Sequence, residues 1–173
     1  MIMEDSLETQ VCMLESHMDG MIERAKKNEE MLKRFQDLDM RLLSLNSLRE
    51  LVEHIHDDAK LVFKLTSLSL VLADASGDIQ QFLAEDGFKF DEFSSVILLS
   101  EVVLFKAKLG LSPSVLLGEA ERILPKEFWP SSVPMPTTVA VIPLLRRGVY
   151  LGCMVFGSED KVRFQVDMAT YFL

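Results

Sequence analysis

The fold is decided by the sequence VAVIPLLRRGVYLGCMVF, which covers Val139–Phe156. Two apolar runs, Val139–Leu144 and Tyr150–Phe156, flank the short polar turn Arg146–Gly148. This pattern is typical of a β-hairpin that is buried on at least one face. Because proline has no backbone N–H to donate, we expect the strand with Pro143 to lie at an edge of the sheet or to end there.

A second hairpin is predicted upstream. The alternating segment Thr66–Ala73 predicts a strand, Asp74–Asp78 is a turn signal, and Ile79–Leu83 is predicted as a short second strand. The segment Ser95–Lys108 fits either a buried helix or a strand. Between Leu83 and the hairpin at Val139–Phe156, the chain therefore holds at least one element of undecided type.

Shorter elements are predicted in the middle of the chain. We expect a short strand at Val115–Gly118, then one or two turns of helix at Glu119–Leu124 that end at Pro125. The segment Trp129–Thr138 contains three prolines and is predicted to be mostly loop. A final helix is predicted to begin at Val166 and has no C-terminal capping signal, so we expect the chain to be a fragment of a longer protein.

Glycine and proline are distributed unevenly. Of the eight glycines, only Gly20 precedes Gly77, and all six prolines lie at or after Pro113. Both residues interrupt helices, so the chain consists of two unlike parts, of which the first is almost free of helix breakers.

The first part has a heptad pattern. From Leu14 onward, its core residues recur at alternating spacings of four and three, which predicts a helix that pairs with another helix. One core position is occupied by Leu14, Met21, Asn28 and Phe35, and the other by Met18, Ala25 and Leu32. A buried asparagine such as Asn28 lowers stability but can fix the register and favour a parallel pair.

The outer face of this helix supports the same interpretation, because it carries acids placed four residues before bases. The pairs are Glu23 with Lys27, Glu29 with Lys33, and Glu30 with Arg34. The narrow apolar stripe and charged flanks favour an intermolecular coiled coil. The alternative is an arm folded back on its own domain.

The heptad phase slips after Phe35. Ser47 and Glu50 fit a capping box, which predicts a break near residues 44–47 and a second helix over Leu48–Leu65. A single bent helix is the alternative. We therefore divide the chain into an N-terminal helical arm, residues 1–44, and a domain over residues 45–173.

These elements together predict an α+β fold. We expect an antiparallel sheet with helices packed on one face, preceded by a long N-terminal helix of coiled-coil type. This layout is that of small-ligand sensory domains of the GAF and PAS type. In a GAF-like fold a ligand pocket would form within the segment Phe88–Trp129.

The end of the chain has a more specific motif. The sequence GSEDKVRF covers Gly157–Phe164 and is followed by DMATYFL, Asp167–Leu173. Together with the preceding strand that closes in Pro-Leu, this end resembles the GAF-like family called domain of unknown function 484. That family has the motifs Gly-Ser-x-Asp-x-x-Arg-Phe and Met-x-Thr-x-Phe-Leu. The match covers Val139–Leu173, with Val166 where many members have proline, and the upstream half resembles the family in layout only.

The resemblance implies a regulatory module rather than an enzyme. Members of this GAF-like family occur alone or ahead of a signalling output in bacterial proteins. That output is often a GGDEF domain, a diguanylate cyclase that makes cyclic di-GMP. The resemblance therefore implies a sensory domain that could precede such an output.

The motif residues also have a physical interpretation. Gly157 either adopts a conformation closed to other residues or lets the backbone pass close to a neighbour, and Gly157–Asp160 is expected to end the strand. We expect Ser158 and Asp160 to accept hydrogen bonds from N–H groups of the turn. Arg163 can pair with Asp160 or with turn carbonyls, and Phe164 can anchor the loop in the core. We interpret the motif as a structural latch before the last helix, with ligand binding as the less supported alternative.

Composition and charge exclude several classes of protein. The net charge of −9 argues against nucleic acid or an anionic membrane surface as the main partner. The chain has no apolar stretch long enough to cross a bilayer and no basic residue before its first acids, so we expect a cytoplasmic location. Cys12 and Cys153 lie too far apart in sequence to indicate a disulfide framework or a metal cluster.

Candidate catalytic and metal sites are weak. His54 and His56 are two residues apart on a helix and point in different directions, so a shared metal ion is not expected. Cys153 lies in an apolar strand and is interpreted as a core residue, while Cys12 could cross-link two chains. The sequence has no glycine-rich phosphate loop and no nucleophile elbow. We therefore expect no catalytic residue, cofactor or metal, and the binding of a small molecule stays open.

Three hypotheses follow from the sequence. The first is a homodimeric GAF-like sensory module that passes a signal through its helices to a C-terminal output. The second is a stand-alone protein–protein interaction module without a small-molecule ligand. The third is an enzyme on a GAF-like scaffold, for example a redox enzyme that uses cysteine, and it is the weakest because the one candidate cysteine is apparently buried.

Overall fold

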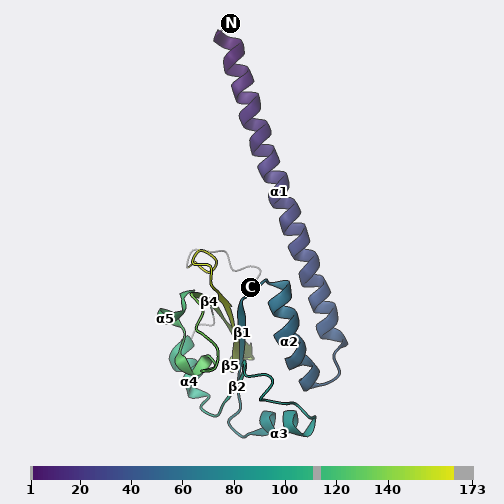
Figure 1. Ribbon diagram of the computed structural model, residues 1–173, viewed down its shortest axis with the longest axis vertical. Coiled ribbons are helices and arrows are strands. Elements are labelled where there is room, and N and C mark those ends of the chain that lie inside the picture. The colour runs from purple at the N-terminus through teal and green to yellow at the C-terminus, as the bar shows by residue number, and fades with distance from the viewer. Residues whose placement is uncertain (1, 111–113, 166–173) are drawn as a thin grey trace. The chain divides into compact units, whose positions relative to one another are not determined.

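The computed structural model describes residues 2–110 and 114–165, with the side chains from residue 7 onward. The chain forms two compact units, Met1–Leu43 and Ser44–Leu173. The first unit is one continuous helix, α1, which spans Ile2–Ser44 and is drawn in purple in Figure 1. At a rise of 1.5 Å per residue, this helix is about 65 Å long. None of the described helices is long and apolar enough to span a bilayer.

A helix break separates α1 from α2, Leu48–Val62. Ser47 is extended, with φ −136°, and its Oγ accepts a hydrogen bond of 3.1 Å from the N–H of Glu50. The Glu50 carboxylate accepts one of 2.9 Å from the N–H of Asn46. The predicted break and cap are therefore confirmed, and the single bent helix is excluded.

The second unit contains a five-stranded sheet in the order β2-β1-β5-β4-β3. Its strands are β1, Ser67–Ala73; β2, Val96–Leu99; β3, Leu116–Glu119; β4, Thr138–Arg146; and β5, Val149–Ser158. Strands β1 and β2 pair in parallel, and the other neighbours are antiparallel. The α+β class is correct, but the expectation of a purely antiparallel sheet is wrong.

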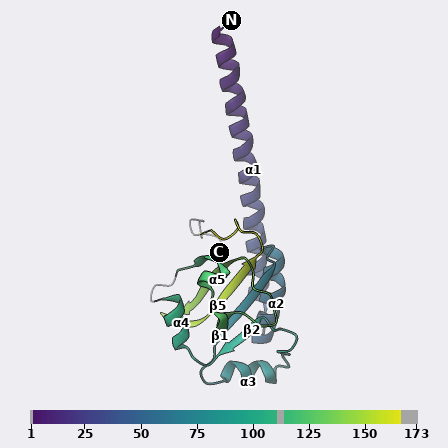
Figure 2. The ribbon, with the colours of Figure 1, turned by 60° about the vertical axis from the view of Figure 1, so that its left-hand side comes forward.

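The parallel pair results from a helix where the sequence suggested a strand. The segment predicted as a strand at Ile79–Leu83 belongs to α3, Asp78–Glu85. The Asp74 carboxylate, at the end of β1, accepts hydrogen bonds of 3.1 Å and 2.9 Å from the N–H groups of Ile79 and Gln80. These bonds satisfy free donors at the helix N-terminus, where negative charge is also favoured. Parallel neighbours need such a crossover, and Figures 1 and 2 show α3 at the lower end of the sheet.

The β4–β5 hairpin is confirmed. Its turn residues Arg147 and Gly148 have φ values of 52° and 78°, as a two-residue turn with left-handed residues requires. The strand of Pro143 lies inside the sheet and continues to Arg146, so the expectation that it lies at an edge or ends at this proline is wrong. The proline is tolerated because, among the described residues, β3 pairs with β4 only as far as Val141 and needs no N–H from position 143.

The segment of undecided type, Ser95–Lys108, contains both alternatives in succession, strand β2 and then helix α4, Val103–Leu109. The predicted short elements after it are present as β3 and α5, Ala120–Ile123, and a 3₁₀ turn follows at Lys126–Phe128. The final helix predicted from Val166 lies outside the described residues.

Helices cover both faces of the sheet, so the expectation of helices on one face is wrong. On one face α2 contributes Ala59, which packs with Leu68 and Phe156 of the sheet. On the other, α4 contributes Phe105, which packs with a group of strand residues including Val71. Figure 1 shows α2 on one side of the sheet and α4 and α5 on the other. The cause is in the sequence, because β1 and β4 are apolar at successive positions and must be buried on both faces.

Candidate functional site

The motif Gly157–Phe164 lies at the end of β5, where the sequence indicated a latch. β5 ends at Ser158, within the segment Gly157–Asp160 that was expected to end the strand. A Cβ atom on Gly157 would collide with Ser67 Oγ and would lie 2.8 Å from Pro136 Cγ. Gly157 has no left-handed backbone angle. A close approach to neighbouring atoms, rather than a backbone conformation closed to other residues, therefore explains the glycine at position 157.

The turn after β5 is held by its own polar side chains. The N–H of Asp160 donates to Ser158 Oγ over 3.1 Å, and the N–H of Val162 donates to Asp160 Oδ1 over 2.9 Å. Both acceptors act as the sequence suggested. Thr138 Oγ1 of β4 also donates to the Asp160 carbonyl over 2.8 Å, which ties the turn to the neighbouring strand.

Arg163 reaches a different partner from those expected. Its guanidinium donates to the carbonyl oxygens of Phe63 and Lys64, at 2.7 Å for the second, instead of pairing with Asp160 or the turn. These carbonyls lie just past the C-terminus of α2, where a positive charge is favoured by the helix dipole. Burial lowers the pKa of Arg163, and the charge of Asp160 opposes this shift.

The end of α2 explains why these carbonyls need a donor. Lys64 has φ 51°, and the N–H of Leu65 donates to the Lys60 carbonyl over 2.9 Å, as in a Schellman motif. A non-glycine residue at this left-handed position is uncommon. This motif ends α2 at Val62, before the predicted Leu65, and turns the Phe63 and Lys64 carbonyls toward Arg163.

The last motif residue, Phe164, is 3% exposed and packs with Ala59 of α2 and Phe156 of β5. The Arg163 guanidinium carbon lies 5.4 Å from the centre of its ring. The structure thus brings the five motif residues together with the end of α2. We call this group the latch: Gly157, Ser158, Asp160, Arg163, Phe164 and the carbonyls of Phe63 and Lys64. Sequence reasoning missed the two carbonyls, since backbone acceptors a hundred residues away leave no signal in the motif.

The predicted dimer residues all lie on α1, and most of them are exposed. The exposed fractions are 63% for Leu14, 59% for Met18, 54% for Met21 and 50% for Leu32. Ala25 and Asn28 are also exposed, and Phe35 is half-buried. Leu7 and Val11 are 58% and 52% exposed and extend the same heptad by one repeat, which the sequence reasoning did not use. We call these nine residues the α1 stripe.

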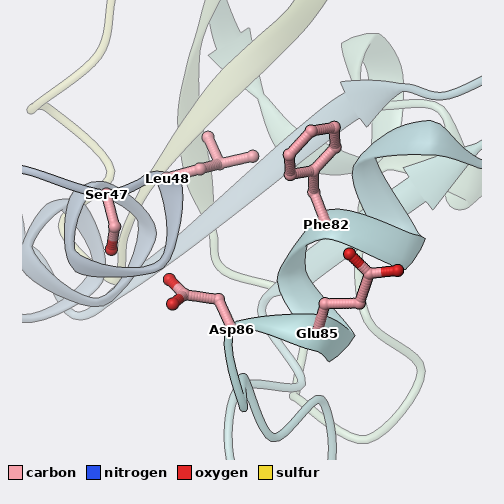
Figure 3. A pocket seen from close by; sticks show the side chains of 5 residues that line it. All are labelled: Ser47, Leu48, Phe82, Glu85 and Asp86. Carbon is pink, nitrogen blue, oxygen red and sulfur yellow. The ribbon is translucent and has the colours of Figure 1, made fainter.

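A hollow of about 470 Å³ opens between α2 and α3. It is lined by Ser47, Leu48, Phe82, Glu85 and Asp86. Figure 3 shows Leu48 and Phe82 extending toward the same space, with the Asp86 carboxylate on the side of Ser47. Phe82 is 68% exposed, and Arg49 Nη1 donates to the Asp86 carbonyl over 2.9 Å. The hollow therefore combines an apolar surface with two carboxylates.

The segment in which a GAF-like pocket was expected, Phe88–Trp129, contributes buried aromatic side chains to the core. Phe105 and Phe128 are fully buried and stack at 5.1 Å between ring centres. Tyr150 lies 6.2 Å from Phe105, and its hydroxyl donates to the Gly110 carbonyl over 2.9 Å. These side chains fill the space between the sheet and α4.

Cys12 lies on α1, Cys153 lies on β5, and His54 and His56 lie on α2. Cys153 is fully buried, and burial raises the pKa of its thiol to about 12, so it is protonated and unreactive at neutral pH. Cys12 is exposed on α1. His54 and His56 bond to different carboxylates, those of Asp58 and Asp57. Across the described part of the chain, no three His, Cys, Asp or Glu residues are placed to hold a metal ion.

Comparisons with known proteins add no family. No model of a known protein family matches the chain, and no curated protein sequence matches it. The resemblance to the GAF-like family therefore stays a prediction, carried by the motif Gly157–Phe164.

Proposed function

We propose that this chain is a non-catalytic regulatory module that forms a homodimer through the α1 stripe and relays a signal to an output domain. The observation that carries the proposal is the stripe itself. Its apolar members keep a heptad spacing from Leu7 to Phe35 while most of them stay half or more exposed. A second copy of the same helix supplies the complementary surface that such a pattern requires.

The energetics favour a partner. Helices in proteins gain most of their stability from packing of an apolar face, and most apolar side chains of the α1 stripe are exposed. Each leucine or methionine that becomes fully buried contributes about 1.5–3 kcal/mol, so a few paired heptads are enough for a stable dimer. The i,i+4 ion pairs Glu23–Lys27 and Glu30–Arg34 lie at 3.1 Å and 3.9 Å and support the helix itself.

The connections of α2 suggest how a signal would pass. Its N-terminal cap, Ser47, follows directly after the end of α1, and its C-terminal end is held by Arg163 of the latch. Arg163 lies just before the residues that would lead to an output. A shift in the pairing of α1 would therefore act on α2, and through the latch on the end of the domain. From the family resemblance, the output would be a diguanylate cyclase of the GGDEF type in the bacterial cytoplasm.

The test is the oligomeric state by light scattering. We expect the full chain to be dimeric. A chain that lacks residues 1–44 should fold, because the second unit has its own buried core, and should be monomeric, because it lacks the α1 stripe. If the shortened chain is dimeric to the same extent, the proposal fails.

A second candidate is a protein–protein interaction module with no small-molecule ligand. The packed aromatic core around Phe105 and Phe128 favours it, because these side chains occupy the region where a ligand pocket was expected. Native mass spectrometry of the purified protein distinguishes the two. A bound small molecule supports the sensory module, whereas unliganded protein in both cell-derived and refolded samples supports the interaction module.

A further inference from the structure

We infer that the two α1 helices of the dimer run parallel and in register, with Asn28 facing Asn28 and Arg24 facing Glu29 of the other copy. This inference rests on the proposed dimer and adds what that proposal leaves open, the orientation of the partner. The heptad spacing alone allows both orientations, so the orientation has to be inferred from Asn28 and from the charged residues that flank the α1 stripe.

The first argument is the place of the stripe residues in the heptad. Leu7, Leu14, Met21, Asn28 and Phe35 share the position conventionally called d. Val11, Met18, Ala25 and Leu32 share position a. In a parallel pair d faces d, whereas in an antiparallel pair d faces a.

Asn28 distinguishes the two arrangements. In the parallel pair in register, its amide faces the same amide of the second copy, and each can donate to the other. In an antiparallel pair a d residue always faces an a residue, so no antiparallel register places Asn28 opposite Asn28. The antiparallel register that pairs the stripe residues from Val11 to Phe35 with one another sets Asn28 against Met18, which leaves two buried amides without partners.

The flanking charges give the same answer. Position g of one helix lies beside position e of the next heptad in a parallel partner, which pairs Arg24 with Glu29 twice in the dimer. Both side chains are exposed, and Arg24 Nε already donates to the Gly20 carbonyl over 3.1 Å, which holds the guanidinium along the helix.

The antiparallel arrangement places like charges next to each other. There g lies beside g and e beside e, so Arg24 meets Arg24 and Glu29 meets Glu15. Both contacts are repulsive. The parallel arrangement therefore satisfies the buried amide and the flanking charges at the same time.

The two native cysteines allow a direct test. A nitroxide label attaches to exposed Cys12 and not to Cys153, which is fully buried and protonated. In the parallel dimer the two Cys12 residues lie at the same height, and pulsed electron paramagnetic resonance should give a distance below about 30 Å. In the antiparallel register Cys12 lies opposite residue 34, a separation along the axis of 22 residues or about 33 Å, and the label distance approaches about 40 Å.

A charge substitution gives an independent readout with opposite signs. In the parallel dimer, Glu29→Arg places two bases beside each other twice and should raise the dimer Kd about tenfold. In the antiparallel dimer, the same change places a base beside Glu15 and should lower the Kd. Glu30→Arg is the matched control, since this neighbouring position is on the outer face and should change the Kd less than about twofold.

The outcomes separate this inference from the proposed function. A dimer with the long label distance, and tighter binding for Glu29→Arg, overturns the parallel register and leaves the dimer proposal standing. A monomeric full chain overturns both. The short distance together with weaker binding for Glu29→Arg supports the register, and Cys12→Ser, which should take up no label, confirms where the label sits.

Discussion

The two units of this chain place their apolar residues in opposite ways. In α1, Leu14 is 63% exposed and the apolar side chains form one narrow line. In the second unit, Phe105 and Val71 are fully buried on one face of a sheet whose other face is covered by α2. The difference teaches that the second unit has a core of its own, whereas α1 has a surface that becomes a core only with a partner. Substitutions should therefore separate folding in one unit from association in the other.

The largest effect is expected from Phe105→Ala. Phe105 is fully buried and stacks on Phe128, so its removal should lower the free energy of unfolding of the second unit by about 3–5 kcal/mol. The single tryptophan, Trp129, lies in the same cluster and reports this unfolding by fluorescence in denaturant. Phe82→Ala removes the same side chain where it is 68% exposed, and should cost less than about 1 kcal/mol. Equal costs for the two variants would contradict the division between core and surface.

A similar effect on association is expected from Leu14→Glu. It places a charge twice in the dimer seam and should weaken the dimer by about 3 kcal/mol or more, which is over a hundredfold in Kd. The Trp129 unfolding transition should stay unchanged at a concentration where the protein is monomeric. Met13→Glu is the control, because Met13 is 69% exposed next to the stripe but outside it. Sedimentation velocity gives both constants, and equal weakening by Met13→Glu would show that the stripe is not the dimer surface.

A smaller effect is expected from Arg163→Gln in the latch. The change removes the charged donor from the carbonyls of Phe63 and Lys64 and should lower the free energy of unfolding of the second unit by about 1–2 kcal/mol. Arg122→Gln is matched to it, since Arg122 is exposed and forms a surface ion pair with Glu119. That control should cost less than about 0.5 kcal/mol. No difference between the two arginines in thermal or chemical unfolding would mean that the latch contributes nothing to stability.

The smallest effect concerns pH. Folding raises the pKa of Cys153 from 9.0 to about 12, so the folded unit keeps this proton while the unfolded chain loses it above pH 9. The contribution to stability is therefore complete below pH 9 and falls as the pH rises toward 12, with a loss at pH 9 of less than about 1 kcal/mol. Cys153→Ala should lack this part of the pH dependence. Alkylation of native protein at pH 9 should modify Cys12 only, and rapid modification of both cysteines would contradict the burial of Cys153.

Local signals explain which elements could be predicted from the sequence. The β4–β5 hairpin is encoded by apolar runs around Arg147-Gly148, and the start of α2 by Ser47 and Glu50 only three residues apart. Both depend on neighbours in the chain. The same holds for the turn bonds of Ser158 and Asp160, which were predicted from the motif alone.

Two different causes explain what was missed. The segment Ile79–Leu83 is too short for its apolar residues to distinguish a strand from a helix, and it is helical where the Asp74 carboxylate caps it from the end of β1. The parallel pairing of β1 with β2 follows from that crossover. The partner of Arg163 was missed for another reason, since its acceptors are backbone carbonyls that any sequence would offer.

The distance of the latch along the chain has a kinetic consequence. Arg163 and its acceptors Phe63 and Lys64 are separated by 100 and 99 residues, so the contact closes a loop over most of the second unit. Closing so long a loop is costly in entropy before the sheet between the two ends has formed. The latch should thus be absent from the folding transition state, and its loss should speed unfolding while leaving the refolding rate unchanged. We therefore expect Arg163 to slow the unfolding of this unit while having little influence on its rate of folding.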